Sequence, residues 1–470
     1  MDQPVLTPLR ADLSPFTFHL ASATLHPTPF SHMWLLPHQP RISRWIANSM
    51  HRITAVEGAL DASGPVLLVA NHPNALIDPV VVTAAVGRPV RWLAKATLVF
   101  QPWVGWLFRA AGAIPVYRRQ DDASQMDRNA DTFDAAVRAL GDGNVVALFP
   151  EGISHAAPGL APLKTGAARL ALQAVATLGR PIPIVPVGVI YRDASIYRSP
   201  AGVVIGTPIA WADLAAAGPE DRDAATELTA RIATALAGVT RQLDSWADQG
   251  VVEHAAAVVA ATTAGDEAPP SWIARASGMH SLMDAADDPL LPPLRARLRR
   301  HARALARLGM TPAQLAGQVQ SPTIQWWRGW RAPLVAIVWA VGLIWTWVPY
   351  RATGQIANRL TRDRDLLATL KAVVGFALFV AWILATALLV GAVTCWPWGL
   401  GALPLGLALA LVTLQLEEAR QAREQADRAA HWRRRRSLQL DALTLEQSAL
   451  ADDLRALLPR TPPEPTSTQG

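Results

Sequence analysis

The sequence of 470 residues has a single cysteine, Cys395, and only 17% of its residues are charged. One cysteine excludes an intrachain disulfide, so folding does not depend on an oxidising compartment. His, Cys, Asp and Glu do not gather in the sequence at the spacing of metal ligands, and we predict no metal site. The charged fraction lies below the roughly 25% of an average soluble protein, which indicates a chain partly surrounded by lipid.

Hydrophobic residues and tryptophan are abundant instead. Hydrophobic residues make up 51% of the sequence, there are 18 tryptophans, and the formal net charge is +6 with a pI near 10.0. A basic chain favours anionic partners, which are acidic lipid headgroups or nucleic acid. The basic residues lie beside apolar runs rather than among exposed aromatics, so we predict contact with membrane lipids and not with nucleic acid.

The first half of the chain alternates short apolar runs with longer segments rich in Ala, Leu and Arg. The runs are VLLVA (66–70), RWLAK (91–95), AIPVY (113–117), VVALFP (145–150), IPIVPVGVIY (182–191) and GVVIGTPI (202–209). One of the longer segments, 165–178, consists of good helix formers and ends at Gly179, a common helix terminator. This alternation predicts an α/β fold with a buried central β-sheet flanked by helices.

Two long stretches nearer the C-terminal end carry no charge, residues 332–350 and 372–416. A membrane-spanning helix needs about 20 apolar residues, so the second stretch, interrupted by CWPWG at 395–399, predicts a transmembrane hairpin. Both ends of this hairpin have basic flanks, which predicts an integral membrane protein with its α/β domain on the cytoplasmic face. The first stretch is basic at both ends, which favours an interfacial or re-entrant segment over a further span.

Composition divides the sequence into six predicted regions. Segment 211–320 is rich in Ala, Arg, Leu and Asp without a strand pattern, and both ends of the chain are interrupted by Pro and Thr. The regions are a poorly ordered N-terminus (1–32), the α/β domain (33–210), a helical region (211–320), a membrane region (321–416), a charged helix (417–458) and a disordered tail (459–470).

The stretch NHPNALIDP, residues 71–79, follows the first buried run of the α/β domain directly. Functional groups of α/β sheets are often presented at such a strand end. A carboxylate at Asp78 can fix the tautomer of His72, which leaves the other imidazole nitrogen to take a proton from a substrate hydroxyl. The simpler interpretation is that His72 is an ordinary hydrogen-bonded turn residue.

Three further groups follow the later apolar runs. GAIPVYRR ends in Arg118 and Arg119, and guanidinium groups suit bidentate phosphate binding. FPEGISH places Glu151 before a glycine that lets a ligand approach the backbone. Lys164 immediately precedes the helix at 165–178, and free N–H groups beside a lysine favour an anion. Solvated surface charges are the simpler interpretation of each group taken alone.

Together these blocks carry a resemblance. NHPNALIDP, GAIPVYRR, FPEGISH with LKTGAARLAL, and IVPVGVIY resemble, in this order, the four sequence blocks of the glycerol-3-phosphate and lysophosphatidate acyltransferases. They are most similar to the branch that acylates glycerol 3-phosphate or dihydroxyacetone phosphate. The resemblance covers residues 40–210 strongly and the apolar C-terminal region loosely.

The resemblance implies a role for each matching residue. It implies that His72 is the base that activates the acceptor hydroxyl, with Asp78 as its partner, and that Arg118 or Arg119 binds phosphate. It implies that Glu151 and Gly152 position the glycerol moiety and that Pro186 lies on the acyl-donor side. The predicted site therefore comprises His72 and Asp78 as the catalytic pair and Asn71, Arg118, Arg119, Glu151, Gly152, Ser154, Lys164 and Pro186 as substrate-binding residues, with Asn71 also a candidate oxyanion donor.

Two departures from the family pattern affect this site. Five residues separate His72 from Asp78 instead of the commoner four, which rotates the carboxylate by about 100° around a helix, so contact requires a local loop. The third block has EGIS where EGTR is commoner, and Lys164 is our candidate for the missing arginine.

The expected function is transfer of a fatty acyl chain from a thioester to a phosphorylated glycerol-type acceptor. The thioester, on coenzyme A or on acyl carrier protein, is a co-substrate, and no cofactor is predicted. The alternatives are an acyltransferase for lysophosphatidate, another lysophospholipid or an amino-lipid, and, from another class, an inactive membrane scaffold that binds lipid.

Overall fold

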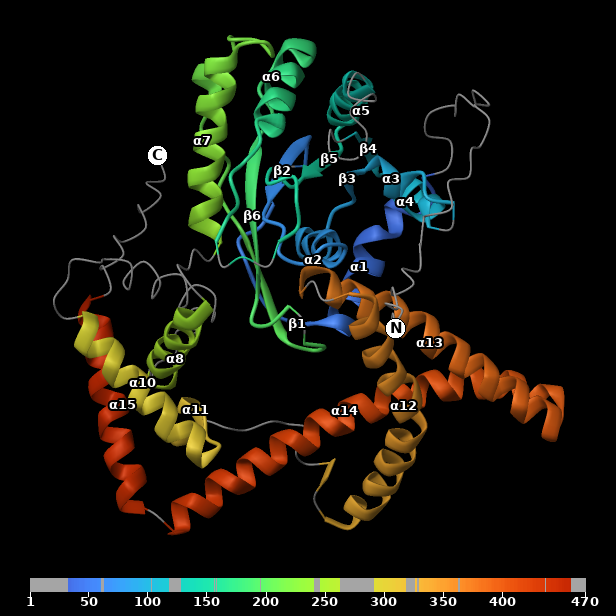
Figure 1. Cartoon of the computed structure of the whole chain (residues 1–470), viewed down its shortest axis with the longest axis vertical. Helices are drawn as coiled ribbons and strands as arrows, with labels where there is room; N and C mark the ends of the chain where they lie inside the picture. Colours follow the sequence, from blue (N-terminus) through green and yellow to red (C-terminus); the bar gives the residue numbers. More distant parts are fainter. Residues whose placement is uncertain are drawn as a thin grey trace, which may run out of the picture.

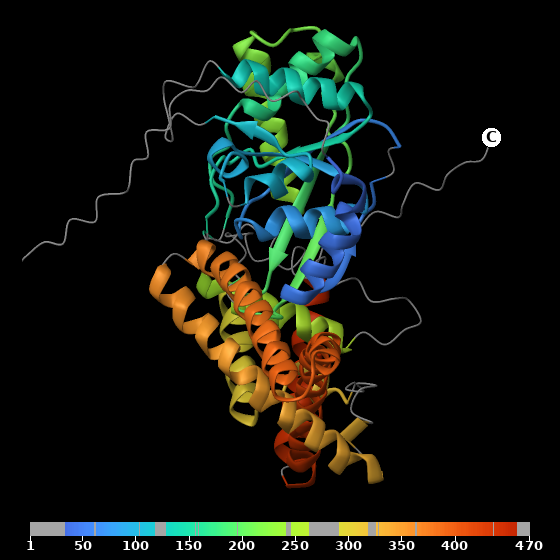
Figure 2. The same ribbon diagram turned by 90° about the vertical axis from the view of Figure 1, so that its right-hand side faces the viewer.

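The computed structural model describes the chain in thirteen ranges, namely 33–60, 63–102, 104–117, 128–155, 157, 159–194, 196–240, 246–262, 291–317, 326–327, 329–361, 364–435 and 437–457. Two predicted regions, 1–32 and 459–470, and the predicted phosphate ligands Arg118 and Arg119 lie outside these ranges. Figures 1 and 2 show a part that contains the sheet and, beneath it, a part that consists of helices.

The sheet forms the centre of the first part. Its strands are β1 (Arg52–Glu57), β2 (Val66–Ala70), β3 (Val90–Lys95), β4 (Ile114–Val116), β5 (Val145–Leu148), β6 (Ile184–Tyr191) and β7 (Pro200–Ile205). Their order is β1-β7-β6-β2-β5-β3-β4, and all neighbours are parallel except β6 and β7. The predicted fold class, a buried sheet flanked by helices, is confirmed.

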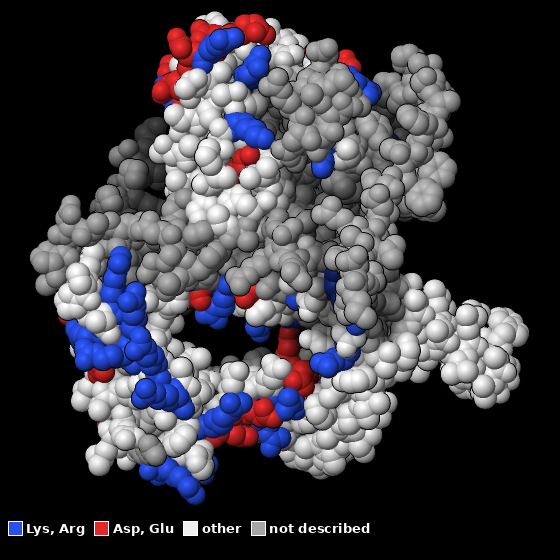
Figure 3. Space-filling model, in the orientation of Figure 1, with Lys and Arg blue, Asp and Glu red and all other residues white. Residues whose placement is uncertain are grey.

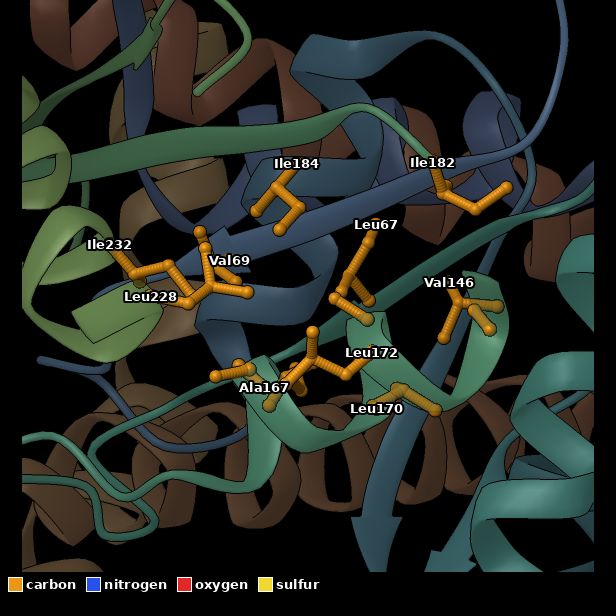
Figure 4. Packing of buried hydrophobic residues seen from close by; sticks show 14 of the residues in the cluster. Leu67, Val69, Val146, Ala167, Leu170, Leu172, Ile182, Ile184, Leu228 and Ile232 are labelled. Atoms are coloured by element: carbon orange, nitrogen blue, oxygen red, sulfur yellow. The ribbon is translucent and has the colours of Figure 1, made fainter. Parts of the chain in front are cut away.

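Helices cover both faces because the side chains of β2 alternate between them. Leu67 and Val69 pack against α5 (Asn129–Gly141), α6 (Gly166–Leu178) and α7 (Arg222–Val239), and Figure 4 shows this packing. Val66 and Leu68 pack on the opposite face, against α1 (Gln39–Met50) and α2 (Ile77–Val86). A strand that is buried on both faces has consecutive apolar residues in its sequence, which is why VLLVA could be predicted to be a strand.

Two features of this domain differ from the prediction. Strand β1, with the sequence RITAVE, was missed because it lies at the sheet edge and lacks an apolar run. The predicted boundary at 210 is also too early, since α7 packs on the sheet with Leu228, Ile232 and Leu236 almost fully buried. A side-chain carbon added at Gly188 of β6 would lie 1.8 Å from the carbonyl oxygen of Val239, so the end of α7 rests directly on the strand.

A second group of helices has a core of its own. It contains α8 (Trp246–Thr262), α10 (Leu291–Leu308), α11 (Pro312–Leu315) and α15 (Ser437–Leu457), and we call these four helices the helical module. Buried apolar side chains of α8, α10 and α15 pack together. The shorter elements of the structure are α3 (Ala96–Val99), α4 (Gly105–Ala110) and the 3-10 helices η1 (Leu36–His38), η3 (Ala212–Leu214) and η5 (Gly329–Arg331).

Three long helices fill the membrane region. They are α12 (Ala332–Leu360), α13 (Arg364–Val393) and α14 (Trp396–Arg435), and the described residues include three segments long and apolar enough to cross a membrane, Gly329–Leu360, Thr369–Val393 and Trp396–Arg435. The predicted hairpin corresponds to α13 and the first part of α14, and Figure 3 shows an uncharged protrusion at its tip. Helix α12 is continuous, which excludes a re-entrant turn in the first stretch and is compatible with an interfacial or a spanning helix. The boundary predicted at 416 lies inside α14, and the expected single helix 417–458 is the end of α14 followed by α15.

Two polar contacts join the long helices to the α/β domain. The backbone N–H of Leu76, in the loop after β2, donates to the hydroxyl of Thr369 on α13 at 3.3 Å. Arg198, in the loop after β6, forms an ion pair with Glu418 on α14 at 2.8 Å. The long helices therefore contact the loops at one end of the sheet.

Candidate active site

The predicted motif residues meet at one edge of the sheet. His72 follows β2, Glu151 follows β5, and these two strands are parallel neighbours. The carboxyl ends of parallel strands lie side by side, and this is where α/β folds place their functional groups. Accordingly, the backbone N–H of His72 donates to the Glu151 carboxylate at 2.9 Å, and the N–H of His155 donates to the carbonyl of His72 at 3.2 Å.

His72 and Asp78 form a hydrogen-bonded pair. The Nδ1 atom of His72 lies 2.9 Å from Oδ2 of Asp78. Asp78 is fully buried, whereas the His72 side chain is 13% exposed. A carboxylate only accepts hydrogen bonds, so Nδ1 carries the hydrogen and Nε2 is left with a free lone pair. The pair therefore has the arrangement of a general base with an orienting carboxylate.

A short loop brings the two residues together despite their spacing of six. Helix α2 begins only at Ile77, so residues 71–76 are free to turn. Ala75 has φ of +32°, outside the regions that side chains prefer. The loop is held by the Ser154 hydroxyl, which accepts from the N–H of Ala75 at 3.0 Å, and by the contact of Leu76 with Thr369. The local loop that the sequence required is thus present.

The plane of the His72 ring is fixed by stacking. The ring lies 3.7 Å from that of Phe149, centroid to centroid, with an interplanar angle of 4°. Phe149 in turn stacks on Trp92 of β3 at 4.7 Å. A ring held on one face by aromatics and at Nδ1 by Asp78 has little freedom to rotate, which favours a fixed direction for Nε2.

Glu151 is buried and holds the loop that carries His72. It is 2% exposed, and its Oε1 accepts from the N–H of His72. Its Oε2 accepts from the N–H of Ala161 at 2.7 Å and is also bonded to Nε2 of His155. Both oxygens are therefore bonded by the protein itself. The described contacts give Glu151 a role in holding the backbone of His72, and its predicted contact with an acceptor stays a prediction.

Gly152 and Lys164 lie against each other beside this turn. Gly152 has φ of +70°, and a side-chain carbon added there would come within 2.6 Å of the Lys164 amine. The backbone N–H of Lys164 donates to the carbonyl of Pro150 at 2.8 Å, which ties the segment before α6 to the turn. The sequence placed Lys164 near a helix start, and the structure also places its exposed side chain over the Glu151–Gly152 turn.

Two further predicted residues contact or belong to β6. The amide of Asn71 both donates to and accepts from the backbone of Val189 on β6, at 3.0 and 2.7 Å. It clamps β2 to β6 with one of its two amide hydrogens, and its predicted role as an oxyanion donor stays a prediction. Pro186 is buried within β6, in register with Val69 near the end of β2 that leads to His72. Its predicted role on the donor side stays a prediction.

Several residues of the site were not singled out in the sequence. Tyr191 donates its hydroxyl to Oδ1 of Asp78 at 2.8 Å, and the N–H of Asn74 donates to Oδ2 at 2.7 Å. His51 lies 4.8 Å from the Tyr191 ring, centroid to centroid. Asn74 and Tyr191 fall within the sequence blocks quoted above. His51 and Thr369 belong to no motif, because contacts between distant segments leave no local pattern in the sequence.

Burial sets the protonation of the groups behind the pair. Burial lowers the pKa of His51, so this imidazole is neutral near pH 7. Burial and the neighbouring charge of Asp78 raise the pKa of Tyr191 well above its usual value, so its hydroxyl stays protonated. Among the described residues, no group of three His, Cys, Asp or Glu side chains is arranged to hold a metal ion.

Comparison with known proteins identifies the domain. Residues 52–190, which run from β1 almost to the end of β6, match the family model described as Acyltransferase. This match identifies residues 52–190 as an acyltransferase domain. The resemblance of the four sequence blocks is thereby confirmed, and His72, Asp78, Glu151 and Pro186 all lie within the matched part of the acyltransferase domain.

Two curated relatives match the acyltransferase domain. The chain is 30% identical over 180 residues to lyso-ornithine lipid O-acyltransferase of Rhizobium meliloti (strain 1021), which is 37% of this chain and 56% of that protein. It is 39% identical over 82 residues to glycerol-3-phosphate O-acyltransferase 2 of Saccharomyces cerevisiae (strain ATCC 204508 / S288c), 17% of this chain and 11% of that protein. The chain thus spans little more than half of the first relative and a small part of the second.

A solved structure is also similar. It is the crystal structure of the 1-acyl-sn-glycerophosphate (LPA) acyltransferase PlsC from Thermotoga maritima, with 17% identity and a TM-score of 0.32, covering 42% of this chain and 76% of that chain.

Proposed function

We propose that the chain is a membrane O-acyltransferase that moves a fatty acyl chain from a thioester to the hydroxyl of glycerol 3-phosphate or dihydroxyacetone phosphate. The observation that carries the proposal is the His72–Asp78 pair, with Nδ1 engaged by the buried carboxylate and Nε2 left free at the sheet edge. The donor is a thioester on coenzyme A or acyl carrier protein, and the chemistry needs no further cofactor.

The reaction follows from the free nitrogen of His72. Nε2 removes the proton of the acceptor hydroxyl while its oxygen attacks the thioester carbonyl, and Asp78 stabilises the imidazolium that forms. The tetrahedral adduct then collapses, the carbon–sulfur bond breaks, and the imidazolium returns its proton to the leaving thiolate. An ester and a free thiol are the products. General-base action of this kind contributes a factor of about 10² to 10⁴ in rate.

A phosphorylated acceptor is supported by charge near the pair. The amine of Lys164 lies over the Glu151–Gly152 turn, on the same sheet edge as His72. An ammonium group attracts a phosphate monoester, which would bring a glycerol hydroxyl of the same molecule toward Nε2. One of the two curated relatives is named for transfer to glycerol 3-phosphate.

A second acceptor class is supported by the other relative. The longer match, over 180 residues, is to a protein named for transfer to a lyso-ornithine lipid, whose headgroup is an amino acid. The same pair could activate a hydroxyl of such an amino-lipid or of lysophosphatidate without change. The headgroup contact distinguishes the amino-lipid from the phosphorylated acceptors, since Lys164 favours a phosphate, which lysophosphatidate and glycerol 3-phosphate share.

We further propose that the acyltransferase domain works at the cytoplasmic face of a membrane. The three long apolar segments support an integral membrane protein. The basic residues that flank the hairpin support a cytoplasmic position for both of its ends.

Acyl transfer by the detergent-purified protein tests the proposal. A labelled long-chain acyl thioester is offered with glycerol 3-phosphate, dihydroxyacetone phosphate, lysophosphatidate or lyso-ornithine lipid in separate reactions. His72→Ala is compared with wild type and with His38→Ala, a matched change at an exposed histidine outside the site. We expect transfer to a glycerol phosphate acceptor that falls by about 10² to 10⁴ in His72→Ala alone.

Each other outcome has a defined meaning. Transfer only to lyso-ornithine lipid would replace the acceptor and keep the mechanism. Equal activity in wild type and His72→Ala would refute the catalytic role of the pair. No transfer to any acceptor would favour the inactive lipid-binding scaffold.

A further inference from the structure

A buried polar cluster lies behind the His72–Asp78 pair and has no part in the mechanism derived so far. Asp78 is 0% exposed and accepts three hydrogen bonds from described residues. Oδ2 accepts from Nδ1 of His72 at 2.9 Å and from the N–H of Asn74 at 2.7 Å, and Oδ1 accepts from the hydroxyl of Tyr191 at 2.8 Å. Two of these donors lie in the loop directly before α2, the helix that carries Asp78, whereas Tyr191 approaches from β6.

Tyr191 is a fixed point for this carboxylate. It is the last residue of β6, a strand paired on both sides, and its side chain is buried. Two residues earlier on the same strand, Val189 is clamped by the amide of Asn71. Side chains on paired strands hold a geometry more precisely than side chains on loops do. Strand β6 therefore fixes the position of the Tyr191 hydroxyl more rigidly than the 71–76 loop, with its positive φ at Ala75, could fix a donor to Asp78.

The bond to Oδ1 also fixes where Oδ2 points. A carboxylate is planar, so a donor that holds one oxygen determines the direction of the other. With Oδ1 held by Tyr191, Oδ2 faces the ring of His72. A buried carboxylate without that donor would be left with an oxygen that has lost its partner, a costly state in a low-dielectric interior.

The histidine behind this arrangement is uncharged. His51 packs against the Tyr191 ring, and its Nε2 lies 3.5 Å from the side-chain nitrogen of Asn74. Burial lowers the pKa of His51, so it does not compete with His72 for the negative charge of Asp78. His72 is therefore the imidazole that this carboxylate orients.

We propose that Tyr191 is a positioning residue of the acyl-transfer site, which acts by holding Oδ1 of Asp78 so that Oδ2 orients the ring of His72. The proposal deepens the proposed function and rests on it. Tyr191 touches neither substrate nor the reacting atoms, so its effect passes entirely through Asp78.

Tyr191→Phe tests this role because it removes one oxygen and little else. Tyr197→Phe is the matched control, since Tyr197 is 46% exposed and lies in the loop after β6. We expect Tyr191→Phe to lower kcat by about 10- to 100-fold with little change in KM, because a hydrogen bond to a charged group is lost. We expect no change in Tyr197→Phe.

The pH dependence separates positioning from a merely structural effect. A carboxylate that loses a donor attracts the proton of its imidazole partner more strongly. The acid limb of the kcat/KM profile should therefore move to higher pH by about half to one unit in Tyr191→Phe. In an Asp78→Asn background the same change should have little further effect on kcat, because the two residues act in one chain.

A second measurement does not depend on acyl transfer at all. The rate at which diethyl pyrocarbonate modifies His72, followed by peptide mass spectrometry against pH, reports the protonation of this imidazole directly. Its midpoint should rise in Tyr191→Phe and stay unchanged in Tyr197→Phe. If wild type transfers no acyl group, the proposed function fails, yet this midpoint still tests Tyr191.

Two results would overturn the proposal. One is wild-type kcat and unmoved midpoints in Tyr191→Phe. The other is a loss of kcat with unmoved midpoints and a lowered melting temperature, which would make Tyr191 a packing residue only.

Discussion

The acyltransferase domain and the helical module each contain a partly buried histidine with a partner at the same distance. Nδ1 of His72 lies 2.9 Å from a carboxylate oxygen of Asp78, and Nε2 of His254 on α8 lies 2.9 Å from Nδ1 of His301 on α10. A carboxylate favours the charged form of an imidazole, whereas a second imidazole disfavours it. Burial, and to a lesser degree His301, lower the pKa of His254 to about 4. The distance to the partner therefore does not determine the charge of an imidazole; its burial and the type of its partner do.

The acyltransferase domain and the long helix α14 also differ in where their charged groups lie. In the acyltransferase domain Asp78 and Glu151 are almost fully buried, each with several donors. On α14, Arg420 pairs with Glu417 and Glu424 at the surface, one helical turn away. Buried groups depend on every partner, while exposed pairs are screened by water, so equal changes in the two regions should have unequal effects.

The largest expected effect comes from replacing the charged partner of His72 by a neutral one, so that it resembles the uncharged partner of His254. Asp78→Asn replaces the carboxylate of the acyltransferase domain by a neutral group, and the imidazolium loses its stabilising charge. Acyl transfer should fall by about 10² to 10⁴. Steady-state rates with a labelled thioester measure this, and Asp131→Asn, at an exposed position in the first turn of α5, is the control. Unchanged turnover in Asp78→Asn would remove the distinction between the two histidine pairs.

The helical module should show the next largest effect, as a dependence of stability on pH. The pKa of His254 is lowered from 6.5 to about 4 on folding, so the unfolded chain binds this proton at a higher pH than the folded chain. Stability is complete above pH 6.5 and falls as the pH drops toward 4, by up to about 3 kcal/mol. Denaturant unfolding at pH 7, 6 and 5 measures the slope. His254→Gln should flatten it, and parallel slopes in variant and wild type would contradict the assignment.

The smallest effect should appear when a Glu→Gln substitution is made in the acyltransferase domain and, separately, in α14. Glu151→Gln removes the charge of a buried acceptor and should cost about 1 to 3 kcal/mol of unfolding free energy. Glu424→Gln breaks exposed pairs of α14 and should cost less than about 0.5 kcal/mol. Thermal unfolding of the two variants against wild type measures the difference. Equal losses would mean that burial does not distinguish the two carboxylates.

Sequence patterns predicted the parts of the fold that depend on local composition. Strand β2 and its neighbours in the sheet centre are apolar on both faces, and helix α6 ends at Gly179, so each produced a pattern within a few residues. Strand β1 is polar and stands at the sheet edge, and the reversal between β6 and β7 depends on pairing, so neither produced one. The uncharged stretches indicated α12 to α14, but their flanking charges did not reveal that α12 is continuous or that α14 extends to Arg435.

In the candidate site, sequence analysis identified residues and the structure supplied their partners. His72, Asp78 and Glu151 were selected because their blocks are distinctive. Tyr191 contacts Asp78 across 113 residues and Asn71 contacts Val189 across 118, and no local spacing encodes such contacts. The same limit hid the clamp between Asn71 and Val189, since the type of a residue does not show which strand it bonds.

The hydrogen bond between Leu76 and Thr369 links the order of synthesis to the state of the loop that holds His72. The two residues are 293 positions apart. A ribosome that adds about 5 to 20 residues per second needs roughly 15 to 60 s to make the intervening chain. During that interval the nascent acyltransferase domain can fold, but its catalytic loop still lacks the partner on α13. The loop reaches its full set of contacts only after the first helix of the apolar hairpin has emerged, so completion of the site and delivery of the chain to a bilayer fall at the same stage of biosynthesis.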